Sequence, residues 1–297
     1  MGVNGLLNVN KPAGCTSFSI VAGIRRLSGE RRVGHAGTLD PAASGVLPVC
    51  LGQATRVAEY LLQYPKEYVA GIEMGISTDT YDGEGRVTGR GPLHNISLAC
   101  VEHALRAFEG AIDQVPPAFS AVKIGGRKAY DLARAGQQVI LQPRRVHIHN
   151  IKVISFDLPY LKLIISCSKG TYIRSLANDL GQSLGCHAYL KDLVRTSYGP
   201  FKIEDSVTPD QLQKTASEGH LNQMLYPLDC AFPVSERVYL DESQAGSVQK
   251  GLDVPLGIQS QCSKGYCCAY TTDGRLLAVM KFVTENGLWH PEKVFNL

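Results

Sequence analysis

Long apolar runs are missing from this 297-residue sequence. No stretch approaches the roughly 20 apolar residues that a helix needs to cross a bilayer, and the segment from Met1 to Pro12 lacks the apolar core of an export signal. The nine cysteines are odd in number and, apart from Cys267-Cys268, scattered singly, which argues against a disulfide framework. These absences predict a soluble protein of the reducing cytoplasm with no membrane partner.

Signatures of nucleotide, acyl and metal chemistry are also missing. The chain contains no P-loop, no dinucleotide-binding glycine fingerprint and no Gly-x-Ser-x-Gly turn. His147 and His149 would share one face of a strand, but no Cys, Asp or Glu lies at ligand spacing from them. Cys262 with Cys267-Cys268 lacks a second pair of ligands. We therefore expect no metal site.

The composition, with 44% hydrophobic and 19% charged residues, is that of an ordered globular protein. Interspersed strands and helices with many hairpin-like pairs predict an α+β fold with a mixed, largely antiparallel sheet. A change of pattern near residue 230 predicts a large domain followed by a small β-rich one. Strands are predicted over residues 5–11, 45–51, 66–74, 146–151, 161–167, 266–270 and 276–282, and helices over residues 17–27, 55–62, 98–110, 129–135 and 171–184.

Charge is distributed unevenly, although the net charge is only +3. Residues 1–60 carry six Lys or Arg against three Asp or Glu, and residues 120–200 carry twelve against four. The other two stretches, 61–119 and 201–297, are acidic. If the two basic stretches meet in the fold, they form a face suited to a polyanion; otherwise the cations only solvate the surface.

The most informative segment is Gly34-His35-Ala36-Gly37-Thr38-Leu39-Asp40-Pro41-Ala42-Ala43-Ser44-Gly45, here called the Asp40 loop. Its glycines let the backbone turn tightly and approach a ligand closely, and a loop that carries an acid is a usual place for chemistry. The alternative is a turn in which Asp40 only accepts hydrogen bonds from nearby backbone N–H groups. The local pattern leaves both interpretations open.

Three further segments carry residues suited to binding. Tyr68, in Lys66-Glu67-Tyr68, either offers a face on which a base can stack or is a half-buried sheet residue. Lys169 and Arg174 flank the start of a predicted helix, which suits a phosphate or carboxylate unless Thr171 simply caps that helix. The third segment, residues 114–123, contains Pro116-Pro117 and leads rigidly into a basic hairpin.

Together these motifs resemble the TruB family of tRNA pseudouridine synthases in its bacterial form. The Asp40 loop resembles the family's catalytic loop. Further matches follow in family order over residues 5–200: Asn10-Lys11-Pro12 with Gly14 and Ser17, Lys66-Glu67-Tyr68, Gln114 to Lys123 with Gly126 and Tyr130, Lys169 to Arg174, and Leu190 to Leu193. By position, the last 60 residues correspond to a PUA-like RNA-binding domain.

The resemblance implies conversion of uridine to pseudouridine at position 55 in the T-loop of tRNA, without a cofactor or metal. It implies a catalytic domain of pseudouridine-synthase type over residues 1–230, with an insertion at about 76–113, and a PUA-like domain over residues 238–297. The implied partner is the T-stem-loop of tRNA, bound by a monomer without a guide RNA. The target base is stacked inside the folded T-loop and has to be flipped out.

The resemblance also assigns roles to residues. Asp40 acts as the nucleophile or as the base that removes the ribose C2′ proton, and Arg174 keeps it ionised through a bidentate pair. Tyr68 stacks on the flipped uracil and relays a proton, while Leu193 supplies an apolar wall. The residues assigned to holding the RNA or the pocket are His35, Lys11, Lys169 and Tyr172.

Two other functions are consistent with a basic face. A tRNA-folding chaperone would need the same surface, although the set of Asp40, Tyr68 and Arg174 favours an enzyme. A guide-RNA-dependent relative that modifies rRNA is the other alternative. The segment from Thr78 to Ala111 resembles the bacterial insertion and argues against it.

Overall fold

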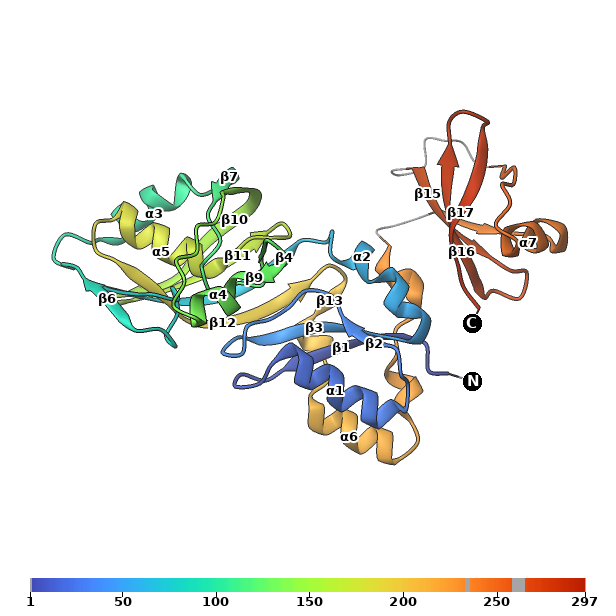
Figure 1. Cartoon of the computed structure of the whole chain (residues 1–297), viewed down its shortest axis with the longest axis horizontal. Coiled ribbons are helices and arrows are strands. Elements are labelled where there is room, and N and C mark those ends of the chain that lie inside the picture. The colour runs from blue at the N-terminus through green and yellow to red at the C-terminus, as the bar shows by residue number, and fades with distance from the viewer. Residues whose placement is uncertain (1, 233–235, 258–264, 297) are drawn as a thin grey trace.

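The computed structural model describes residues 2–232, 236–257 and 265–296. Its main body is a mixed sheet with nine strands in the described residues, drawn from blue to yellow in Figure 1. Seven strands follow in the order β1 (Gly5–Lys11), β3 (Ser44–Leu51), β12 (Ala188–Tyr198), β4 (Lys66–Met74), β11 (Tyr160–Cys167), β10 (Arg144–Asp157) and β7 (Gly110–Gln114), while β2 (Val33–His35) pairs with β3 and β13 (Phe201–Lys202) with β12. All pairs are antiparallel except β3 and β12, which confirms the predicted largely antiparallel mixed sheet.

Six helices accompany this sheet in the described residues. Those of the main body are α1 (Ser17–Ser28), α2 (Ala58–Leu61), α3 (Leu98–Arg106), α4 (Ala129–Arg134), α5 (Ile173–Ser183) and α6 (Pro209–Ser217), with short 3-10 segments η1 (Gly52–Val57), η2 (Ile203–Asp205), η3 (Leu221–Met224) and η4 (Leu228–Ala231). α1 begins where the Thr16 side chain accepts from the Ser19 N–H, and it ends at Gly29, which adopts a left-handed conformation. Its buried face, Ile20, Val21 and Ile24, joins the main core.

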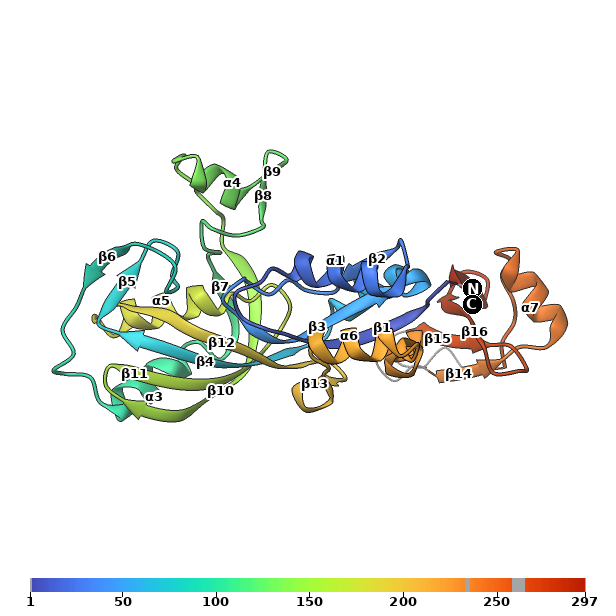
Figure 2. The ribbon, with the colours of Figure 1, turned by 90° about the horizontal axis from the view of Figure 1, so that it is seen from below.

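Two short ribbons extend from the sheet. β5 (Ile76–Thr78) pairs with β6 (Val87–Arg90), and β8 (Lys123–Ile124) pairs with β9 (Arg127–Lys128). Figure 2 shows the second ribbon and α4 projecting from the same side of the sheet as α1. We call residues 120–143 the projecting hairpin.

The C-terminal unit has its own four-stranded sheet in the order β14 (Glu236–Tyr239), β15 (Tyr266–Tyr270), β16 (Leu276–Val283) and β17 (Leu288–Val294), together with α7 (Glu242–Gln249). It is docked on the main body, because one apolar cluster contains Leu61 and Leu228 as well as Leu276 and Phe295. An ion pair from Lys293 Nζ to Glu59 Oε1, 2.7 Å long, lies at the edge of this contact.

The predicted elements agree with the structure in most places. The strand predicted over 146–151 is the longer β10, no strand was predicted at β12, and three helices differ. The helix predicted over 98–110 ends at Arg106, because Gly110 already begins β7. The helix predicted over 55–62 starts as the 3-10 turn η1. The helix predicted from Thr171 starts at Ile173, and Thr171 donates to the Ser168 carbonyl instead of capping it.

Candidate active site

The Asp40 loop is held against the segment between β1 and α1. The Ser17 hydroxyl accepts from the Leu39 N–H and donates to the Leu39 carbonyl, both at 3.0 Å. Lys11 is fully buried, and its Nζ donates to the carbonyls of Pro12, Cys15 and Pro41 at 2.8 to 3.3 Å. Backbone groups on both sides of Asp40 are thus held by buried side chains.

Arg174 lies between two carboxylates. Its Nε is 2.9 Å from Asp40 Oδ2, and its Nη1 is 3.2 Å from Asp82 Oδ2. The Nε–H is not aligned with the Asp40 oxygen for a hydrogen bond, so the contact is an ion pair without a hydrogen bond. The predicted bidentate pair with Asp40 is therefore wrong: Asp82 takes up part of the guanidinium, and Asp40 contacts it through one oxygen.

The position of Arg174 follows from the start of α5. Gln114 holds the residue before the helix on both backbone groups, since its Oε1 accepts from the Tyr172 N–H at 2.8 Å and its Nε2 donates to the Tyr172 carbonyl at 3.1 Å. The Ser175 hydroxyl donates to the Val115 carbonyl at 2.7 Å. Arg174 itself donates to the Phe119 carbonyl at 3.1 Å. The segment following β7 therefore fixes the guanidinium from one side.

A cavity of about 190 Å³ opens at this ion pair. Its lining includes Asp40, Asp82, Arg174, Leu190 and Leu193. The loop that carries Asp82 reaches this place through a β-bridge to Leu190 on β12. The fold thus brings Asp40, Arg174 and Leu193 to one cavity and adds Asp82 from the insertion as an acidic wall.

Tyr68 lies on β4, directly opposite Arg195 on β12. The side chain is buried, and burial raises the pKa of its hydroxyl; the Asp40 charge acts in the same direction and the Arg195 charge against it. The hydroxyl is therefore protonated at neutral pH. Tyr68 lies close enough to Asp40 for the two groups to interact electrostatically.

The four residues that were predicted to hold the RNA or the pocket lie in different environments. Lys11 supports the Asp40 loop from inside, so its burial favours holding the pocket over holding RNA. Lys169 is exposed, with its Nζ 2.6 Å from Gln63 Oε1. Burial and the Arg195 charge lower the pKa of His35, whose buried Nδ1 has no hydrogen-bond partner among the described residues. Burial raises the pKa of the Tyr172 hydroxyl, which lies beside Ser120.

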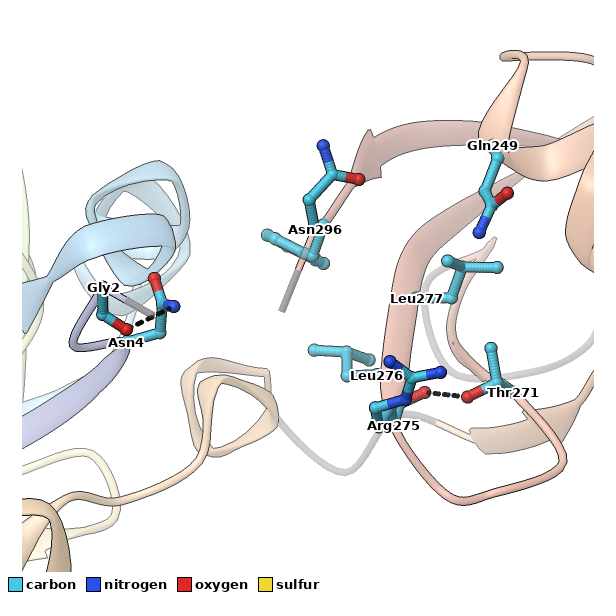
Figure 3. Close-up of a pocket in the computed structure, with 9 residues that line it drawn as sticks. Gly2, Asn4, Gln249, Thr271, Arg275, Leu276, Leu277 and Asn296 are labelled. Carbon is cyan, nitrogen blue, oxygen red and sulfur yellow. Dashed lines mark hydrogen bonds between the residues drawn. The ribbon is translucent and has the colours of Figure 1, made fainter.

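A larger cavity, of about 460 Å³, lies between the N-terminal segment and the C-terminal unit (Figure 3). Asn4 approaches it from one side, and Arg275, Leu276 and Asn296 from the other. Its lining includes none of the residues predicted to act on a substrate. We therefore place the candidate active site at Asp40.

Only the first of the two weak metal candidates lies wholly within the described residues. The rings of His147 and His149 lie 4.7 Å apart between centroids, while Cys262 falls outside the described residues. Over residues 2–232, 236–257 and 265–296, no group of three or more His, Cys, Asp or Glu is placed to hold a metal ion. No helix in the same residues is long and apolar enough to cross a membrane.

Sequence reasoning missed two charged residues at the site. Asp82 lies in the predicted insertion, where no site residue was predicted; an acid followed by Gly83 and Gly85 was the available signal. Arg195 is fully buried on β12, and its signal was a cation within a run that the structure shows to be a central strand.

Two family models match this chain in succession. The model described as TruB family pseudouridylate synthase, N-terminal domain, matches residues 25–173. The model described as tRNA pseudouridylate synthase B C-terminal domain matches residues 174–233. The second match begins at Arg174, the residue that forms the ion pair with Asp40.

Curated relatives match over nearly the full length. A protein named tRNA pseudouridine synthase B from Dehalococcoides mccartyi strain 195 is 44% identical over 99% of this chain and 97% of its own. The protein of the same name from Bacillus licheniformis is 39% identical, with 98% and 97% covered.

Solved structures share the fold. A structure titled as a Cbf5-Nop10-Gar1 complex has a chain that is 29% identical, with a TM-score of 0.73, and the match covers 98% of this chain and 85% of that one. The chain in a structure of an H/ACA RNP bound to a substrate RNA is 26% identical, also with a TM-score of 0.73, covering 99% and 85%.

Proposed function

This chain belongs to the TruB family of pseudouridine synthases, and from that membership we propose that it isomerises uridine 55 in the T-loop of tRNA to pseudouridine. The bond between uracil N1 and ribose C1′ breaks, the base turns, and C5 bonds to C1′. The C5 proton leaves and N1 gains a proton, so the product is an isomer of the substrate. The observation that carries the proposal is the ion pair of Asp40 with Arg174 at the mouth of a cavity.

Asp40 is the group that acts on the ribose. It attacks C1′ or removes the C2′ proton, and either role requires a carboxylate that is both ionised and accessible. Arg174 lies in direct contact with this carboxylate, while the Asp40 side chain remains 43% exposed. Its partner Arg174 is only 7% exposed, so the charge pair is anchored from inside and open toward the substrate.

The flipped base is held by the surrounding side chains. Tyr68 stacks on the uracil and offers a hydroxyl that can relay a proton, and Leu193 forms an apolar wall. Lys11 and His35 stabilise the conformation of the Asp40 loop from its buried side. Lys169 and Tyr172, at the start of α5, lie on the side from which the RNA enters.

The partner is the T-stem-loop of a bare tRNA. The full-length relatives named as tRNA enzymes support this choice, and so does the 76–113 insertion, which in the structure forms β5, β6 and α3. We assign residues 1–230 to the catalytic domain and residues 238–297 to a PUA-like domain that adds RNA contacts. The enzyme then works as a monomer in the cytoplasm, without a guide RNA or a cofactor.

The test uses the purified chain and a T-arm stem-loop labelled with tritium at uridine C5. Because C5 loses its hydrogen when it bonds to C1′, tritium release should follow product formation one to one. Asp40→Asn should stop the release while tRNA binding persists. Substantial turnover by the pure variant would refute the role of Asp40, and full rescue of tRNA maturation in cells by that variant would favour a chaperone.

A further inference from the structure

We propose that Arg195 is a positioning residue that holds the Asp40 loop and Tyr68 in the relative arrangement needed for catalysis; the inference rests on the function proposed above. None of the matched motifs contains this residue, since the match to the family's pocket wall ends at Leu193. It belongs to a central strand of the sheet and is 1% exposed.

The backbone of Arg195 lies between the two parts of the site. On one side, its Cα partner on β4 is Tyr68, in an antiparallel pair. On the other, its Cα partner on β3 is Gly45, the last residue of the Asp40 loop, in a parallel pair of only two residues. Arg195 is thus the residue of β12 that connects the loop that carries Asp40 with the strand that carries the base-stacking tyrosine.

The Arg195 guanidinium also contacts the Asp40 loop, through hydrogen bonds to backbone carbonyls. Nε donates to the Val46 carbonyl at 2.7 Å, Nη2 to the Gly37 carbonyl at 3.0 Å, and Nη1 approaches the Thr38 carbonyl at 3.5 Å. One planar group therefore binds Gly37 and Thr38, which precede Asp40 within the loop, and Val46, which follows the loop. A single side chain thus connects the part of the loop before Asp40 with the residue after the loop.

The ring of Tyr198 completes the support. The Arg195 guanidinium lies 4.9 Å from its centroid, and Lys66 Nζ lies 4.5 Å from it. Tyr198 also packs under Gly37: a Cβ at position 37 would lie 2.8 Å from the Tyr198 ring. The loop therefore rests on an aromatic ring that is itself held by two buried cations.

This arrangement is an unusual way to bury a charge. A buried cation is normally paired with a carboxylate, yet among the described residues no Asp or Glu forms an ion pair with Arg195. The buried charge is stabilised instead by backbone carbonyl oxygens in and next to the loop and by the face of the Tyr198 ring. The geometry of the loop and the solvation of the guanidinium thus depend on one another, which favours a single loop conformation.

A lysine cannot replace these contacts. Three carbonyls that lie in different directions need the planar fork of a guanidinium, whereas an ammonium is a point donor on a flexible stem. We expect Arg195→Lys to fold but to let the loop relax. Displacement of a reacting group by about 1 Å can lower a rate about 100-fold.

The experiment compares Arg195→Lys and Arg195→Gln with a matched control, Arg25→Gln. The Arg25 guanidinium also donates to a backbone carbonyl, that of Val33 at 3.2 Å, but this carbonyl lies outside residues 37–46. Single-turnover rates should fall about 100-fold in both Arg195 variants, with the Kd for tRNA changed less than about threefold. Arg195→Ala should regain activity on addition of millimolar guanidinium ion, while Asp40→Asn should not respond.

Hydrogen exchange separates this inference from the proposed function. Amide exchange over residues 37–46 should accelerate in Arg195→Gln and remain close to wild type in Arg25→Gln, whether or not the wild-type chain modifies tRNA. Unchanged exchange of the loop, or a rate loss matched by an equal loss of tRNA affinity, would overturn the positioning role. An inactive wild type with an Arg195-dependent loop would instead contradict only the proposed function.

Discussion

Arg174 contacts Asp40 through one carboxylate oxygen, Oδ2, at 2.9 Å. Asp82 takes up Nη1 of the same guanidinium, so Arg174 serves two carboxylates. Among the described residues no donor contacts Oδ1 of Asp40, which leaves that oxygen available to a substrate. A bidentate pair would have occupied both oxygens, whereas sharing the cation with Asp82 leaves one oxygen of Asp40 free of Arg174.

Replacing Arg174 by lysine should therefore abolish most of the activity. An ammonium cannot reach Asp40, Asp82 and the Phe119 carbonyl at once, because it lacks the fork that does so here. We expect the single-turnover rate of Arg174→Lys to fall at least about 100-fold, since Asp40 is left misplaced. Rates within a few-fold of wild type would show that charge alone is sufficient.

Asp82→Asn tests the second carboxylate. The asparagine keeps the shape, and its oxygen can still accept from the Thr80 hydroxyl, but the negative charge that shares Arg174 is lost. We expect the guanidinium to shift toward Asp40 and the rate to fall about 10- to 100-fold with little change in tRNA affinity. Glu84→Gln is the control, because Glu84 lines the same cavity without an ion pair among the described residues. Equal effects of both variants would argue against a specific role.

Local motifs of the sequence predicted four residues for this site, and the structure places three of them, Asp40, Arg174 and Leu193, at one cavity. Asp40, Tyr68, Arg174 and Leu193 were predicted because each lies in a recognisable local motif. Asp82 was not, because its role depends on a long-range bridge between its loop and Leu190 on β12. A contact between chain segments this far apart leaves no local pattern.

The central strand β12 was missed for a related reason. It has register shifts between Leu190 and Asp192 and again between Arg195 and Ser197. Each shift interrupts the alternation of inward and outward residues, so Lys191 and Asp192 follow one another on the exposed surface. The period of two that identifies a strand is lost, and the buried position of Arg195 could not be read from the pattern.

Gly45→Ala should destabilise the fold more than an ordinary glycine replacement. A Cβ at Gly45 would lie 2.2 Å from the carbonyl oxygen of Arg195, and the residue has φ of +101°. Gly110→Ala is the matched control, because Gly110 has φ of +86° but no atom within 4 Å of a new Cβ. We expect a loss of about 1 kcal/mol for the control and clearly more for Gly45→Ala, measured by denaturant unfolding. Equal losses would show that the close approach has no energetic consequence.

Lys66 should make the free energy of unfolding depend on alkaline pH. Burial, with the Arg195 charge adding to it, lowers the pKa of Lys66 to about 8 from an ordinary value of 10.5. Between these values the unfolded chain binds more protons than the folded one, so stability rises with pH. Relative to Lys66→Met, wild type should gain up to about 3 kcal/mol between pH 8 and 10.5. Parallel pH curves for the two proteins would contradict a lowered pKa.

The projecting hairpin should account for part of the salt dependence of tRNA binding. Lys123, Arg127 and Lys128 are exposed there, and none forms an ion pair with a described carboxylate. If each cation contacts a phosphate, replacing all three by alanine should reduce the slope of log affinity against log salt by about 2 to 3. The control replaces the same number of exposed lysines elsewhere, namely Lys152, Lys162 and Lys214. It removes equal charge, so an equal change of slope would mean that only net charge attracts the RNA.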